Sequence, residues 1–84
     1  MIKHDWRIAI RLRDDPNFGQ ILTYLLTPEE ATDMIASMLD KPEIAAVWVK
    51  KAGLGTEPRI YTKPWLKKPF YAKLLTTLTR EANS

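Results

Sequence analysis

The sequence predicts an α+β fold in which two strand–strand–helix units form one four-stranded, mainly antiparallel sheet with two helices on one face. Three observations support this prediction. Residues 6–13 alternate between the two faces of a strand, and residues 27–30 carry a helix-start motif. Residues 44–82 then repeat the order strand, strand, helix. The chain has 84 residues, of which 45% are hydrophobic, so we expect a single small domain over residues 1–84 with one core.

The first unit begins with a strand and a turn. The period-2 alternation of residues 6–13 is typical of a half-buried strand. One face carries Trp6, Ile8, Ile10 and Leu12, and the other carries Arg7, Ala9, Arg11 and Arg13. Residues 14–19 (DDPNFG) are rich in turn formers, and residues 20–26 favour a returning strand. The alternative is a loop that leads straight into the next helix, but a hairpin avoids a long structureless connection.

Residues 27–41 carry the signals of a helix. Thr27 is a suitable N-cap, Pro28 occupies the first helical position, and Glu30 completes a capping box. Lys41–Pro42 ends the helix. The side chains at helical spacing that we expect to be buried are Ala31, Met34, Ile35, Met38 and Leu39.

The second unit repeats this order. Residues 44–51 (IAAVWVKK) and 58–63 (PRIYTK) predict two strands around the glycine-containing turn AGLGTE, and residues 67–82 predict a helix. We expect Tyr71, Leu74, Leu75 and Leu78 on its inner face and Lys73, Thr77 and Arg80 outside. Ile10 and Leu74 should both be buried, facing each other between sheet and helix.

Charge is distributed unevenly along the chain. Residues 1–46 contain five Lys or Arg and eight Asp or Glu, a net charge of −3, whereas residues 47–84 contain eight Lys or Arg and two Glu, a net charge of +6. Such an asymmetry is a recognised hint of a polyanionic partner, although a dipolar protein without such a partner would show it as well.

The predicted faces of the sheet define a candidate site. If both helices cover the face that carries Trp6, the opposite face is open to a partner. Val47 and Val49 would point inward on the third strand and Ile60 and Thr62 on the fourth, unless the third strand is central and takes Trp48 into the core. The open face would then carry six cations and two aromatic rings: Arg7, Arg11, Arg13, Trp48, Lys50, Arg59, Tyr61 and Lys63. Cations neutralise phosphates and aromatic rings stack on bases, so this combination is typical of a sheet that binds RNA or single strands.

Residues that support catalysis are sparse. The chain has no cysteine and one histidine, His4, near its start. Gly53 and Gly55 fall between two predicted strands and lack the third glycine of a dinucleotide-binding loop. Asp14 and Asp15 are explained by turn formation better than by cation binding. We therefore expect no catalytic site, no metal and no cofactor.

Part of the first unit resembles a known family. Trp6, the alternating cations of residues 6–13, Asp15–Pro16 and the run TPEEA before a helix are similar to the strand–helix pattern of AP2-like phage-integrase arm-binding domains. That resemblance implies DNA binding through the sheet, although this chain has one strand fewer in the matching region. SPOR-type domains, which bind glycan, share a similar order of strands and helices. We assign no residue role from either family.

Two hypotheses follow. The first is a small non-enzymatic accessory domain that binds nucleic acid through the open face. The alternative is a protein–protein interaction module that meets an acidic protein surface. Such a module would be an adaptor or an inhibitor of a larger enzyme, for example an accessory protein of a phage or mobile element. We expect a cytoplasmic protein without a membrane partner, because the apolar runs are far shorter than the ~20 residues of a membrane span.

Overall fold

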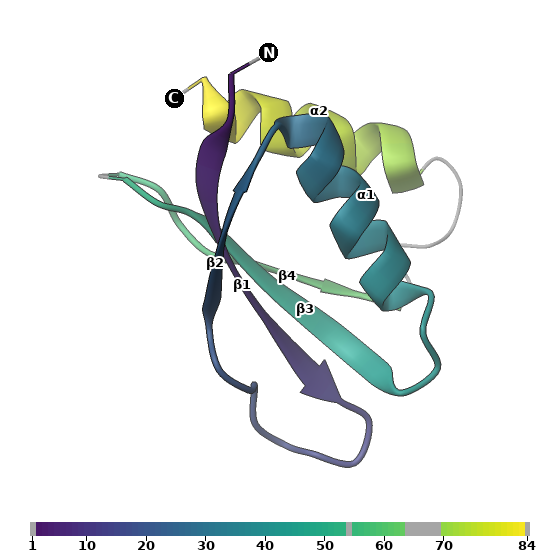
Figure 1. Cartoon of the computed structure of the whole chain (residues 1–84). Helices are drawn as coiled ribbons and strands as arrows, with labels where there is room; N and C mark the ends of the chain where they lie inside the picture. Colours follow the sequence, from purple (N-terminus) through teal and green to yellow (C-terminus); the bar gives the residue numbers. More distant parts are fainter. Residues whose placement is uncertain (1, 54, 64–69, 84) are drawn as a thin grey trace.

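A computed structural model describes residues 2–53, 55–63 and 70–83 and confirms the predicted α+β fold. The four strands form one sheet in the order β2-β1-β3-β4, and all three neighbouring pairs are antiparallel (Figure 1). The elements are β1 (His4–Leu12), β2 (Leu22–Leu26), α1 (Pro28–Leu39), β3 (Ile44–Lys51), β4 (Arg59–Thr62) and α2 (Phe70–Ala82). The hairpin predicted between the first two strands is therefore present, and the predicted start of the second helix at residues 67–69 lies outside the described residues.

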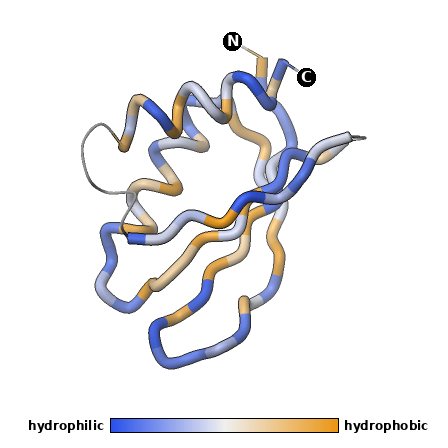
Figure 2. The backbone as a smooth tube through the Cα atoms, turned by 180° about the vertical axis from the view of Figure 1, so that it is seen from behind, coloured by the Kyte–Doolittle hydropathy of each residue, from blue (hydrophilic) through white to orange (hydrophobic). Residues whose placement is uncertain are grey.

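Both helices lie on one face of the sheet (Figure 1). The core fills the space between them and the strands and consists of apolar side chains from five of the six elements, with β2 packed against it through Tyr24 and Leu26. Hydrophobic stretches follow the central strands, whereas the connection between β1 and β2 is mostly hydrophilic (Figure 2). Within that core, the fully buried side chains of largest volume are Trp6, Ile8, Ile35, Leu39, Leu74, Leu78, Val47 and Val49.

The alternation predicted for β1 holds until its last residues. Trp6 and Ile8 are buried, Ile10 packs partly buried against the core, and Leu12 is 46% exposed rather than inward and covered. The pairing of β1 with β3 shifts register between Arg11 and Leu12, which is a β-bulge. Leu12 lies beyond this shift and pairs with the buried Ile44, but is itself left largely uncovered.

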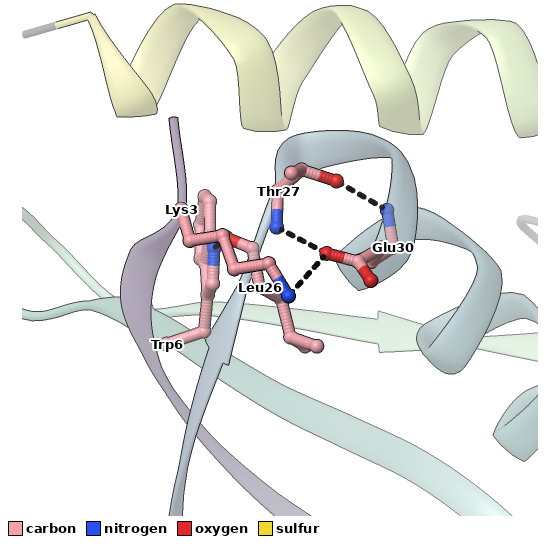
Figure 3. A network of polar contacts seen from close by, with 5 residues as sticks. All are labelled: Lys3, Trp6, Leu26, Thr27 and Glu30. Atoms are coloured by element: carbon pink, nitrogen blue, oxygen red, sulfur yellow. Dashed lines mark hydrogen bonds and ion pairs between the residues drawn. The ribbon is translucent and has the colours of Figure 1, made fainter. Parts of the chain in front are cut away.

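The start of α1 is fixed by the predicted capping box. The Thr27 hydroxyl accepts from the backbone N–H of Glu30 at 3.1 Å, and a Glu30 carboxylate oxygen accepts from the backbone N–H of Thr27 at 3.0 Å (Figure 3). The hydrogen bond from Thr27 lowers the pKa of Glu30. Lys3 lies 3.7 Å from the same carboxylate, and the Trp6 indole N–H donates to the Leu26 carbonyl at 3.1 Å, so the side chains of Lys3, Trp6, Thr27 and Glu30 all have polar partners at the β2–α1 junction.

The buried face of α2 differs from the prediction at Tyr71 and Leu75, and Leu75 is only partly buried and lies outside the group of core side chains. Leu74 and Leu78 are fully buried, as predicted, and Phe70 and Ala82 join them. Tyr71, predicted to point inward, is 44% exposed, because its hydroxyl donates to the Asp33 carboxylate of α1 at 2.6 Å. That bond raises the pKa of Tyr71 and ties the two helices together at the surface.

Candidate binding surface

One face of the sheet is left uncovered by the described helices. In an antiparallel sheet, directly paired residues project to the same side, so the register assigns each side chain to a face. We call the surface opposite the helices the open face; its strand residues are Asp5, Arg7, Ala9, Arg11, Thr23, Leu25, Ala46, Trp48, Lys50, Ile60 and Thr62.

The open face consists of parallel rows that cross the strands. The middle row is Ala9–Trp48–Ile60. One neighbouring row pairs Arg7 with Lys50. The row on the other side starts at Arg11, which pairs with Ala46. An aromatic and aliphatic strip therefore runs between two rows that carry cations.

Trp48 projects from the open face as predicted, so the alternative that placed it in the core is wrong. It is partly exposed and lies outside the group of core side chains. Its neighbours Ala9 and Ala46 are only 3% and 2% exposed. Trp48 stands directly opposite Ala9, and Ala46 lies two residues before it on the same face of β3.

The prediction for β4 is wrong by one residue, so three of the predicted site residues lie elsewhere. Tyr61 pairs with Val47 and is 3% exposed in the core, whereas Ile60 pairs with Trp48 and is 54% exposed. Arg59, Tyr61 and Lys63 thus project to the helix side, because a one-residue change of register moves every side chain of a strand to the other face.

Arg59 and Tyr61 form a polar cluster with α2 instead of a binding face. The Arg59 guanidinium donates to the Glu81 carboxylate, and this bond raises the pKa of Arg59. Burial, helped by the negative charge of Glu81, raises the pKa of Tyr61 to about 12. The ring of Tyr61 therefore belongs to the core and cannot stack on a ligand.

Lys63 stabilises the end of α1. Its ammonium group donates to the carbonyl oxygens of Leu39 and Lys41 at 2.8 and 2.9 Å. The last turn of α1 contains no basic residue of its own, and the carbonyls at a helix end attract positive charge. Lys63, which directly follows β4, thus supplies the cation that the helix lacks.

An open groove of about 740 Å³ continues the open face at one end of the sheet. Arg11 and Thr62 belong to both. Three of the cations predicted for the site meet here, although Lys63 reaches the groove from the helix side. The groove is lined by Arg11, Arg13, Pro42, Ala45, Thr62 and Lys63.

Few negative charges balance the cations of the open face, although Arg13, beyond the end of β1, also lines a depression with Asp14, Asp15 and Glu43. No carboxylate among the described residues forms an ion pair with Arg7, Lys50 or Arg13. Arg11 donates to the backbone carbonyl of Asp15 at 3.2 Å, which orients the guanidinium without neutralising it. Asp5 is the acidic side chain among the strand residues of the open face, so this surface keeps an excess of positive charge.

Sequence reasoning missed two apolar members of the open face. Leu25 on β2 and Ile60 on β4 are 60% and 54% exposed. Leu25 could have been found from the pairing of the first hairpin, since Asp5 is its partner and must share its face. The sequence contains no signal that would place Ile60 on the open face, because each face of the short strand β4 carries one large apolar or aromatic side chain.

Within the described part of the chain, no group of three or more metal-ligating side chains comes together, and no helix has the length and apolar character needed to cross a membrane. Comparison with models of known protein families, with curated proteins and with solved structures finds no match to this chain. The resemblance noted for residues 6–39 therefore gains no support.

Proposed function

We propose that this chain is a cytoplasmic, non-enzymatic accessory domain that binds single-stranded nucleic acid across the open face. The proposal rests on the position of Trp48 between two rows that carry cations. One of these rows ends in the groove that Arg11 and Arg13 line.

The charges around Trp48 suit a polyanionic ligand. Arg7 and Lys50 lie on one side of Trp48, and Arg11 and Arg13 line the groove on the other side. None of the four forms an ion pair with a carboxylate within the described residues. Cations that neutralise phosphates release counterions, which provides most of the sequence-independent affinity for nucleic acids.

Trp48 adds an aromatic surface on which a base can stack. A partly exposed indole in the middle of a sheet is a platform for one base, and stacking of a base on an aromatic side chain contributes ~1–3 kcal/mol. A base can stack on a protein ring only when it has left its own duplex stack. The arrangement therefore favours single strands over duplex.

Titration of a labelled RNA strand, the DNA strand of the same sequence and the DNA duplex, each followed by fluorescence anisotropy at low salt, tests the proposal. We expect binding of at least one single strand, and weaker binding of the duplex. Arg7→Gln should weaken it, whereas Lys73→Gln, a matched loss of charge on the exposed surface of α2, should not. Absence of binding at tens of micromolar protein would refute the proposal.

A protein interface is the second candidate, and the exposure of Leu25 and Ile60 favours it. Ile60 lies beside Trp48 on one outer strand, and Leu25 lies on the other outer strand opposite Asp5. Exposed apolar side chains such as these suit a protein surface better than a phosphate backbone. The two candidates differ in their response to Ile60→Lys. The substitution should strengthen or leave unchanged the binding of a polyanion, and it should abolish the binding of an apolar protein surface.

A further inference from the structure

The strand β2 is an unprotected edge of the sheet. It lies at one end of the strand order and pairs with β1 without a register shift. Residues 16–28 contain no charged side chain, and Ile21, Leu22 and Leu25 are each about half exposed or more. Soluble proteins usually protect such an edge with charges, proline or a bulge, because its free N–H and C=O groups pair readily with another strand.

The other edge of the same sheet carries the protection that β2 lacks. β4 has four residues, Pro58 precedes it, Arg59 begins it and Lys63 follows it. Thr77 of α2 lines a depression together with residues 58–61, so the helix lies beside this edge. The two edge strands differ by one residue in length, so the difference between them is one of charge and proline content. An apolar, uncharged edge on the same sheet as a protected one indicates that β2 pairs with another strand.

We infer that β2 pairs antiparallel with β2 of a second copy of this chain, so that two four-stranded sheets form one continuous eight-stranded sheet. A two-fold axis brings each strand against itself, so the strand must be compatible with its own sequence. LTYLL meets this condition, because no pair of like charges arises in any register.

The neighbouring strands also accept this arrangement. With the axis at Tyr24, Leu22 lies opposite Leu26 of the second copy, and Thr23 lies opposite Leu25. On the open face, the row of Lys50, Arg7 and Thr23 then continues into Leu25 and Asp5 of the second copy. No two like charges become neighbours, and the apolar Leu25 gains a partner.

The pairing goes beyond the proposed function and does not depend on it. It would place the open faces of both copies side by side in one surface, with a Trp48 in each half. A single strand pair is a small interface, so we expect a dimer in equilibrium with monomer rather than a permanent one.

Sedimentation equilibrium without nucleic acid tests the inference, over protein concentrations from about 5 to about 500 µM. The wild-type mass should rise with concentration from one chain to two. Leu25→Lys should remain monomeric over the whole range. Ile60→Lys, a matched charge on the same face but on the protected edge, should dimerise like wild type.

Melting followed by circular dichroism verifies that each variant is folded, and Leu25→Thr replaces Leu25→Lys if the lysine variant does not fold. Hydrogen exchange gives a second readout, because the amides of residues 22–26 should exchange more slowly at high concentration while those of β4 do not change. A wild-type monomer at the highest concentration would overturn the inference and leave the edge to a strand of another protein. A dimer that Leu25→Lys does not weaken, or that Ile60→Lys weakens equally, would overturn it as well.

Discussion

The two faces of the sheet are made by the same strands and have opposite characters. On the covered face, Trp6, Ile8 and Val47 pack under the helices, and the buried Trp6 indole has its N–H paired. On the open face, the residues between them project cations and Trp48, and no described carboxylate forms an ion pair with Arg7 or Lys50. The period of two along each strand thus separates the stabilising residues from those available to a partner.

The largest contrast should appear when the same residue is truncated on each face. Ile8→Ala on the covered face removes a side chain that is 2% exposed, and we expect the free energy of unfolding to fall by ~2–5 kcal/mol. Ile60→Ala on the open face should cost less than about 1 kcal/mol. Urea denaturation of both variants measures this difference, and equal losses would show that the faces are not distinct.

Alkaline pH should reveal the covered position of Tyr61. Its pKa is about 12 in the folded protein against about 10 in the unfolded chain, so the folded state retains the proton longer. The stabilisation is fully present below pH 10 and is lost as the pH rises towards 12, by about 1.4 kcal/mol per unit.

Comparison with Tyr61→Phe isolates the contribution of this phenol from every other effect of alkaline pH on stability. The difference in unfolding free energy between wild type and Tyr61→Phe should change between pH 10 and pH 12, in the direction of a relatively more stable Phe variant. A difference that stays constant over that range would contradict a buried phenol at this position.

How well the sequence predicts each face depends on the length of the alternation. β1 and β3 have nine and eight residues, so the period of two assigned Arg7, Arg11, Trp48 and Lys50 to the open face correctly. β4 has four residues, and the sequence RIYT has one large apolar or aromatic side chain on each face. The contacts made in the observed register are with distant elements: Tyr61 packs in the core, Arg59 binds Glu81, and Lys63 binds the end of α1.

The remaining differences also come from contacts between distant elements. Leu12 continues a clean pattern but lies beyond a bulge that the pattern cannot show. Ile10 is only partly buried, while Leu74 is fully buried as predicted. The helix start at Thr27 was predictable because the capping box is local, with both hydrogen bonds formed within four residues.

The salt dependence of single-strand binding tests the account of the open face most directly. The logarithm of the binding constant should fall linearly with the logarithm of the salt concentration, and Lys50→Gln should reduce the slope by about 0.7, as for one lost phosphate contact on a single strand. Lys73→Gln on α2 should leave the slope unchanged.

Trp48→Ala should weaken binding by about 5- to 150-fold, equivalent to ~1–3 kcal/mol. The slope should stay the same, because stacking releases no counterions, and the melting temperature should stay close to that of wild type. A slope unaffected by Lys50→Gln, together with a large loss of stability in Trp48→Ala, would contradict the account and make Trp48 a structural residue.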